Sequence, residues 1–518
     1  MEQFEVEEPH SAFHRVYLTG AKLMVVLGCL IVGTFLLMLD TSVIATAAPS
    51  IINDFKSLPD LGWYSSVYQL ACAAIQPLTG KIFQRFPLKS TYLAFFLVFM
   101  LGSVLCATAI SSKMFIIGRA VAGLGGAGIT TGALTITSTI ASPQRANELV
   151  GIVMAFSHLG MVMGPIVGGI FSQYVTWRWC FMINIPLGAL IIPVLLLISI
   201  PEQVEKASPL QVFKKLHQQL DLVGFALFTP ATVQLLLALQ YGASGEHAWN
   251  SAVVIGLFCG SGGSLIAWAI WTHIRGKDAI IPMYILKPRV IWAAVLTQCL
   301  IMSSIYMTTI FLSIYFQAVL NASPIESGLD LLAGVVSQLF FTIVTGLVKT
   351  GLVSYFAATA GLFTVGSAIA FTFLGVSSQP VEYIGYQVLG GVGRGAGMQS
   401  QITAINFSLG PADNAVAMAV LMFAQFLFTA IMQVVANVVF LESLRAGLAS
   451  RLPQADAATI IAAGASSFRD VVSAQELPVV LEVYLGGIGN VFWMVCGIGG
   501  LVVLTGLMMG RVKPPQGG

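Results

Sequence analysis

Charged side chains are scarce in this sequence. Only 9% of the 518 residues are Asp, Glu, Lys or Arg, whereas soluble domains carry about 25%. A water-surrounded chain of this size would need far more charged surface than 24 basic and 22 acidic side chains supply. The composition therefore excludes an ordinary soluble protein. Since 57% of the residues are apolar, we expect most of the surface to face a lipid bilayer.

Several other signals are also missing. A net charge of +2 without a basic cluster argues against a nucleic-acid partner. The seven cysteines form no CxxC pair and have no histidine at ligand spacing, so we predict free, buried thiols and no metal site. No phosphate-binding GxxxxGK[ST] occurs. Gly123–Gly128 fits the GxGxxG dinucleotide pattern but lies inside an apolar stretch with no strand before it, which indicates close helix packing instead.

Long apolar stretches are abundant. About 20 such residues cross a bilayer as a helix, and fourteen windows qualify. They are 23–47, 62–80, 90–110, 114–139, 149–172, 180–200, 221–242, 251–273, 290–318, 328–347, 351–375, 382–407, 415–440 and 487–510. The first has no small-residue cleavage site, so we interpret it as a retained span rather than a signal peptide.

The positions of Lys and Arg predict the orientation of these spans. The larger share lies in loops on the side of the N-terminus, including Lys81, Arg85, Lys89, Lys214 and Lys215. Because cytoplasmic loops carry an excess of basic residues, this pattern predicts an all-α integral membrane protein with both termini in the cytoplasm.

The spacing of the spans divides the chain into two related units. The prediction is a tail (1–21), six spans (22–200), linkers with two inserted spans (201–289), six further spans (290–510) with a long outer loop (441–486), and a tail (511–518). Internal echoes support the division. Thr79-Gly80 recurs as Thr345-Gly346, and the glycine-rich stretch around Arg119 recurs around Arg394.

Only three charged residues lie well inside predicted spans, away from their ends. They are Asp40, Arg119 and Arg394. Charges in a bilayer are costly, about 2.5–3.5 kcal/mol at a helix centre on insertion scales, so each is a functional candidate. Asp40 and Arg119 lie at similar depths from the outer ends of their helices. They could form either a titratable pair or a static ion pair, while Arg394 has no carboxylate at a matching depth.

A second feature is a bare helix face in the fifth span. Gly160, Gly164 and Gly168 recur every four residues, followed by Gly169, and Pro165 removes one backbone hydrogen bond. The face predicts either a generic packing seam or a hinge between moving helices.

Other polar groups are candidates for a cavity or for modification. Gln69, Gln76 and Arg394 could line a polar cavity, and His158 either relays protons or is a buried, satisfied histidine. Asn321-Ala322-Ser323 is a sequon for N-glycosylation in a predicted outer loop.

In combination, six motifs make the chain resemble the major facilitator superfamily, and specifically its fourteen-span drug:proton antiporter branch, which includes fungal toxin-efflux pumps. The motifs are Leu39–Pro49, Gly62–Tyr64, Gly118–Gly123, Gly160–Gly169, Trp177–Phe181 and Asn184–Gly188. The resemblance implies two six-helix bundles around a central cavity that opens alternately to either side. It also implies that Arg119 takes part in proton coupling and that the glycine face is the antiporter hinge. From the matching depths we further predict that Asp40 shares the proton-coupling role with Arg119.

One departure from the family pattern concerns the loop after the second span. There, Gly80, Arg85 and Lys89 match the gating loop, but Gln84 and Pro87 replace an Asp and a Gly. The gating usually assigned to that Asp is therefore not expected here.

We thus predict a monomeric plasma-membrane exporter of a hydrophobic toxin, secondary metabolite or drug, which uses the proton gradient and no cofactor. A vacuolar location is the alternative membrane. An importer of a nutrient or siderophore is the alternative function. A membrane enzyme or receptor is disfavoured because the histidines are scattered.

Overall fold

The computed structural model describes most of the chain. It covers residues 17–141, 145–202, 221–244, 247–276, 279, 283–347, 352–409, 411–454, 457–463 and 468–512. Within these ranges every regular element is a helix. The all-helical prediction is therefore confirmed over the described part of the chain.

The helices fall into two halves and an inserted pair. The first half contains α1 (Gly20–Phe55), α2 (Leu61–Arg85), α3 (Leu88–Ala107), α4 (Ser112–Ile140), α5 (Ala146–Tyr174), α6 (Trp179–Met182) and α7 (Asn184–Leu197), with a short η1 (Leu58–Asp60). The inserted pair is α9 (Leu222–Ser244) and α10 (Ala252–Arg275). After α11 (Met283–Leu286), the second half contains α12 (Arg289–Ile314), η3 (Tyr315–Val319), α13 (Pro324–Leu347), α14 (Val353–Thr372), α15 (Pro380–Met398), α16 (Ser400–Ser408), α17 (Pro411–Arg451), α18 (Ala457–Ala463), α19 (Phe468–Val471) and α20 (Leu477–Met508).

Local sequence signals define several helix starts. The hydroxyl of Ser111 accepts a hydrogen bond from the backbone N–H of Met114 and so caps α4. Gln379 and Glu382 form a reciprocal capping box at the start of α15. These caps satisfy backbone donors that would otherwise be unpaired where the helices begin.

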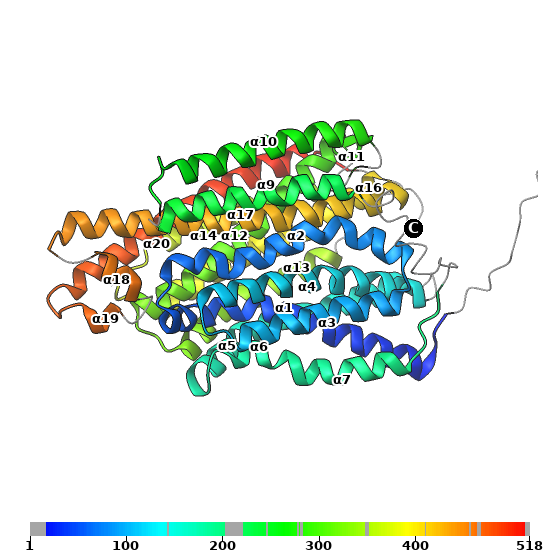
Figure 1. The fold of residues 1–518 in the computed structure, drawn as a ribbon, viewed down its shortest axis with the longest axis horizontal. Coiled ribbons are helices and arrows are strands. Elements are labelled where there is room, and N and C mark those ends of the chain that lie inside the picture. Colours follow the sequence, from blue (N-terminus) through cyan, green and yellow to red (C-terminus); the bar gives the residue numbers. More distant parts are fainter. Residues whose placement is uncertain are drawn as a thin grey trace, which may run out of the picture.

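The long helices lie side by side along the long axis of the molecule (Figure 1). Within the first half α1 packs on α5, and α4 packs on both α2 and α3. Within the second half α14 packs on α20 and α15, and α13 packs on α15. The halves meet chiefly through α2 with α17 and α5 with α13, and also where α1 contacts α12 and α13.

The inserted pair forms a hairpin on the outside of the bundle, with α10 at its upper edge in Figure 1. Asp221 joins the two helices at one end, since its Oδ1 accepts hydrogen bonds from the Gly224 N–H at 2.9 Å and the Trp271 Nε1 at 2.7 Å. The rings of Phe228 and Phe423, 5.0 Å apart, fix α9 to α17.

Eleven helices of the described chain are long and apolar enough to cross a membrane. The three other predicted spans, 62–80, 149–172 and 382–407, fall on α2, α5 and the α15–α16 segment. The last of these is interrupted, because α15 ends at Met398 and α16 begins at Ser400. Fourteen spans therefore remain a prediction.

The predicted outer loop 441–486 is partly helical. Helix α17 continues to Arg451 and α20 already begins at Leu477, with α18 and α19 between them. These two short helices lie at the left end of the molecule in Figure 1, which we call the α18–α19 end. Arg469 donates from Nη2 to the carbonyls of Ala318 and Val319 at 2.9 and 3.0 Å, so α19 covers the end of η3.

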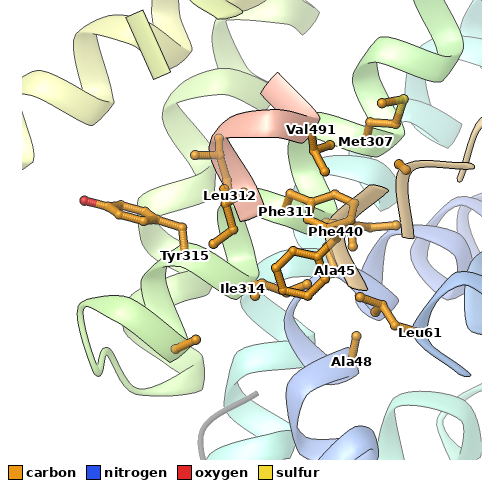
Figure 2. Packing of buried hydrophobic residues seen from close by; sticks show 14 of the residues in the cluster. Ala45, Ala48, Leu61, Met307, Phe311, Leu312, Ile314, Tyr315, Phe440 and Val491 are labelled. Carbon is orange, nitrogen blue, oxygen red and sulfur yellow. The ribbon is translucent and has the colours of Figure 1, made fainter. Parts of the chain in front are cut away.

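A buried apolar cluster joins the two halves near this end (Figure 2). Ala45 and Ala48 of α1 and Leu61 of α2 face Phe311 of α12 and Phe440 of α17. The small alanine side chains allow the helices to approach closely, and burial of the aromatic rings stabilises the contact. The molecule is therefore held together at the α18–α19 end by shared core packing.

Candidate functional site

A buried ion pair links α1 to α4. Nη1 of Arg119 lies 2.5 Å from Oδ2 of Asp40, and the two side chains are 1% and 0% exposed. The structure thus brings together the two residues whose depths match in the sequence. The pairing keeps each charge from being buried alone, which would cost several kcal/mol or more in a low-dielectric interior.

Neighbouring helices hold the Asp40 carboxylate from its other side. Nδ2 of Asn184, on α7, donates to Oδ1 of Asp40 at 3.3 Å and to the Ser103 hydroxyl of α3 at 3.0 Å. Residues of α4 and α7 therefore contact this carboxylate of α1 directly, and α3 is linked to it through Asn184. A shift of this carboxylate would therefore change the packing contacts of α1, α4 and α7.

The Arg119 guanidinium has contacts that do not depend on Asp40. Its Nε donates to the Tyr64 carbonyl at 3.1 Å. Its Cζ lies 4.5 Å from the centroid of the Tyr68 ring and 5.6 Å from that of Phe181. Aromatic faces attract a cation electrostatically, so the site stabilises the arginine even when the carboxylate is neutral.

The glycine face of α5 packs against α1. A Cβ at Gly160, Gly164 or Gly168 would collide with atoms of α1, such as the Ser42 side chain at Gly164. The close approach permits two interhelical hydrogen bonds. The Ser42 hydroxyl donates to the Gly160 carbonyl at 3.2 Å, and the Thr46 hydroxyl donates to the Pro165 carbonyl at 3.1 Å.

The same segment of α5 also contacts the second half. A Cβ at Gly169 would lie 2.6 Å from the Pro324 carbonyl at the start of α13, and a Cβ at Gly328 would collide with the Pro165 carbonyl. Because Pro165 has no N–H, α5 lacks one backbone hydrogen bond within this contact. The glycine face is thus both a packing surface inside the first half and part of the junction between the halves.

Polar contacts accompany this junction. Nε2 of Gln317 donates to the Thr46 carbonyl at 3.2 Å, and Nδ2 of Asn437 donates to the Pro59 carbonyl at 3.0 Å. The Ser65 hydroxyl donates to Oε1 of Gln433. Together with the apolar cluster of Figure 2, these bonds keep the halves closed at the α18–α19 end.

A small cavity of about 40 Å³ lies at the junction of the halves, between α1, α2, α5 and α12. It is lined by Met38, Thr41, Ser42, Ile44, Ala45, Ser65, Met161, Ile305, Tyr306, Thr309 and Ile310. A larger and almost wholly apolar cavity of about 380 Å³ lies between α12 and α17, with Trp292 and Phe428 among its lining residues.

The predicted cavity residues have different surroundings. Gln69 is buried and its Oε1 has no hydrogen-bond partner in the described chain. Nε2 of Gln76 donates to the Thr131 hydroxyl at 3.1 Å within the first half, while its Oε1 likewise has no partner in the described chain. Arg394 is 5% exposed and lies in α15. The backbone of His158 is part of α5, but its side chain lies outside the described residues. The lining of the 40 Å³ cavity includes none of Gln69, Gln76 and Arg394.

The predicted gating loop has a structural contact that the sequence did not indicate. Arg85 ends α2 and is exposed, and a Cβ at Gly80 would meet open space. Lys89 donates from Nζ to the carbonyls of Leu196 and Ile198 at 2.7 and 2.9 Å. A cation at these carbonyls stabilises the C-terminal end of α7.

The sequon lies at the start of α13. Asn321 is exposed and has a positive φ of 55°. The hydroxyl of Ser323 accepts from the Glu326 N–H at 3.3 Å, while Oε2 of Glu326 accepts from the Ser323 N–H at 2.7 Å. Ser323 therefore caps α13, a role that the sequon alone does not reveal. Whether Asn321 carries a glycan stays a prediction.

All seven cysteines have free thiols, as predicted, but not all are buried. Cys259 on α10 is exposed and Cys496 on α20 is intermediate. The prediction of burial was wrong for these two because apolar residues of a membrane helix can face lipid as well as the protein core.

Comparisons with curated proteins find close relatives along nearly the whole chain. It is 44% identical to the MFS-type transporter pigP of Monascus ruber, over 93% of this chain and 85% of pigP. It is 40% identical to the efflux pump mlcE of Penicillium citrinum, over 93% and 89% of the two chains. It is also 40% identical to the efflux pump mokI of Monascus pilosus, over 98% and 96%.

Solved structures share the fold. A bacterial homologue of the human lysosomal transporter Spinster, in an inward-facing and unoccupied conformation, superposes with a TM-score of 0.66 at 15% identity, covering 96% of this chain and 100% of that one. A D-xylose-proton symporter superposes with a TM-score of 0.59 at 14% identity, covering 95% and 98%. The model of the Major Facilitator Superfamily matches residues 30–433. The chain therefore belongs to the major facilitator superfamily, which confirms the prediction of a membrane transporter rather than an enzyme.

Proposed function

We propose that this protein exports a hydrophobic small molecule across the plasma membrane in exchange for protons. The names of its relatives mlcE and mokI, both efflux pumps, support export. The basic loops support fourteen spans with both termini in the cytoplasm, so that the α18–α19 end faces outward. The transporter works as a monomer, and the proton gradient supplies the driving force without a cofactor.

The observation that carries the proposal is the buried pair of Asp40 and Arg119. A proton that binds Oδ2 of Asp40 makes the carboxyl neutral and removes the ion pair. Arg119 then keeps its hydrogen bond to the Tyr64 carbonyl and its contact with the Tyr68 ring. Because the protonated and ionised states hold α1, α4 and α7 together differently, proton binding favours one arrangement of the helices over another.

The exchange of protons for cargo follows from this linkage. The outward-open state admits a proton to Asp40, and its release to the cytoplasm restores the ion pair. Cargo binds when the cavity opens inward. For a proton gradient to drive export, proton binding must lower the affinity for cargo, and cargo binding must lower the affinity for the proton by the same factor.

Opening to the outside must break the junction at the α18–α19 end. The contacts to be broken include Gln317 with Thr46 and Asn437 with Pro59. The glycine face of α5 supports this movement, because its lack of side chains and the missing N–H of Pro165 allow α5 to slide and bend against α1 and α13.

The cargo is proposed to be largely apolar. The 40 Å³ cavity at the junction is lined by apolar side chains with a few hydroxyls, including those of Thr41, Ser65 and Tyr306. Such a surface binds through burial of apolar area, with a small number of hydrogen bonds to orient the ligand. Opening of the inner side would enlarge this cavity to the size of a small molecule.

Inverted proteoliposomes test the proposal. Nile red, a neutral hydrophobic dye, is offered on the cytoplasmic face, and its transport is measured with an imposed proton gradient and after nigericin collapses that gradient. We expect dye transport into the lumen only with the gradient, acid inside. Equal dye transport in both conditions would contradict proton coupling. Net transport of dye from the lumen to the cytoplasmic face would make the protein an importer.

A further inference from the structure

Arg394 is a buried cation without a counter-ion. Its side chain is 5% exposed, and neither Nε nor Nη1 has a hydrogen-bond acceptor in the described part of the chain. It lies fourteen residues after Pro380, the first residue of α15, or about 21 Å along the helix. A guanidinium at this depth needs an anion or strong acceptors to offset its desolvation.

Arg394 differs in its partners from Arg119, the arginine at the corresponding position of the first half. Gly118-Arg119 on α4 and Gly393-Arg394 on α15 stand in corresponding glycine-rich stretches of the two halves. Arg119 has Asp40 as its partner, whereas no ion pair joins Arg394 to a described carboxylate. Among the described residues, the second half thus has the cation of the repeat without a paired anion.

Two glycines lie beside the Arg394 head group, and the buried Gln387 also reaches the Gly334 position. A Cβ at Gly390 would lie 3.3 Å from Nη1, and a Cβ at Gly334 of α13 would lie 3.7 Å from Nη2. Ser367 of α14 is the other close neighbour of Gly390. Larger side chains at the two glycines would fill the space beside the guanidinium, so the sequence keeps this position open between α13, α14 and α15.

A second unpartnered polar group of the described chain lies seven residues further on, in α16. Gln401 is 0% exposed, and neither its Nε2 nor its Oε1 has a hydrogen-bond partner in the described chain. Seven residues separate it from Arg394, and Gln399 between them keeps near-helical dihedrals (φ −91°, ψ −16°); a spacing of two helical turns therefore leads us to expect the two on about the same face, roughly 10 Å apart along the axis. The break between α15 and α16 at Gln399 lies between them. Interrupted membrane helices commonly border substrate sites, because such a break lets one part move relative to the other.

We propose that Arg394 binds the carboxylate of an amphiphilic cargo and that Gln401 binds a second polar group of the same molecule, such as a hydroxyl or carbonyl. This inference rests on the proposed export function and narrows its substrate class to hydrophobic acids. The guanidinium donates two parallel hydrogen bonds to the carboxylate. The apolar remainder of the cargo packs against apolar side chains of the surrounding helices.

Equilibrium binding to the purified full-length protein tests the inference without measuring transport. The probes are 1-pyrenebutyric acid and 1-pyrenebutanol, which share the pyrene and differ in the carboxylate, and binding is followed by energy transfer from tryptophan. We expect the wild type to bind the acid at least about ten-fold more tightly, since a hydrogen bond to a charged group contributes about 1.5–3 kcal/mol. Equal affinities of the wild type for the two probes would overturn the proposal.

Substitutions test whether Arg394 and Gln401 account for the binding of the acid and of a second polar group. In Arg394→Gln we expect the acid to lose its advantage over the alcohol, and in Arg394→Lys we expect part of it to return. Gln401→Leu should weaken binding of a hydroxylated pyrenyl acid and leave the unsubstituted acid unchanged. Arg451→Gln removes a surface cation that is paired with Glu482 and serves as the control. If Arg394→Gln binds the acid as the wild type does, the carboxylate does not bind at Arg394.

A free inorganic anion is the other source of a negative charge for this site. Replacing chloride with gluconate should leave the affinity for the acid within about two-fold, a change below 0.5 kcal/mol. Strong competition by chloride or phosphate, together with equal affinities for the acid and the alcohol, would identify a resident inorganic ion and overturn the cargo assignment. If instead the preference for the acid holds while gradient-driven export fails, the acid site stands and the exporter mechanism is wrong.

Discussion

Asp40 and Arg119 form an ion pair between α1 and α4 with both side chains almost fully buried. Asn184 donates to the carboxylate from α7, and the Tyr64 carbonyl accepts from the guanidinium. Each partner therefore has a second contact that survives when the pair is broken. This is what a titratable pair requires, because a buried ion that has no other support would unfold the site rather than switch it.

Asp40→Asn should uncouple transport from protons. The amide is similar in shape to the carboxyl but cannot release a proton, so we expect gradient-driven dye export to fall at least about ten-fold, as couplings between sites are typically worth about 1–3 kcal/mol. Dye binding to the purified protein should persist. The matched control is Asp54→Asn, since Asp54 pairs with Arg178 at 2.9 Å but is 43% exposed. Coupled export by Asp40→Asn at the wild-type rate would assign the pair a purely structural role.

Gly164→Ala should disrupt the packing of α5 on α1. Its methyl group would collide with the Ser42 side chain, and overpacking of this kind costs about 1–3 kcal/mol. We expect a lower thermal unfolding temperature in detergent and loss of export. Gly151→Ala on the same helix is the control, because a Cβ there meets no atom within 4 Å and alanine favours helix by up to about 1 kcal/mol. Equal behaviour of the two variants would refute a close-packed glycine face.

Lys89→Met separates a stabilising role of Lys89 from a gating role. Lys89 binds the last carbonyls of α7, so we expect a loss of stability of about 1 kcal/mol with export nearly retained once the protein is folded. Thermal unfolding and dye transport of the same preparation provide the measurements. A fully stable variant that does not transport would instead point to gating.

Arg469→Gln tests whether Arg469 holds α19 against the end of η3. The substitution removes the hydrogen bonds to the Ala318 and Val319 carbonyls, so backbone amides in α19 should exchange with deuterium at least several-fold faster. Arg451→Gln, which removes an exposed ion pair with Glu482, should leave them unchanged because surface pairs contribute little, about 0–1 kcal/mol. Unaltered exchange in Arg469→Gln would mean that Arg469 does not hold α19 in place.

The sequence predicted the parts of the structure that depend on hydrophobicity and depth. The long helices and the meeting of Asp40 with Arg119 both follow from where charges interrupt apolar stretches. Helix ends were harder to predict. Residues 441–451 lie outside the apolar window, yet α17 continues through them because Glu, Leu, Arg and Ala favour helix in water as well.

Side-chain partners could not be read from the sequence. Nothing in the pattern around Gln76 shows that its Nε2 donates to the Thr131 hydroxyl, or that Lys89 caps α7. Tyr68 is one aromatic residue among many in apolar stretches, and its place over Arg119 depends on how α2 packs on α4. Asn184 could have been singled out, since an amide in an apolar helix calls for a partner.

Proton flux driven by cargo tests the central claim most directly. Proteoliposomes containing the wild type or Asp40→Asn, loaded with the pH indicator pyranine and starting without a pH gradient, receive a pulse of Nile red on the cytoplasmic face. The account predicts that dye entering the lumen drives protons out, so that the lumen becomes alkaline with the wild type and stays unchanged with Asp40→Asn. Dye transport by the wild type without any change in lumenal pH would contradict proton exchange.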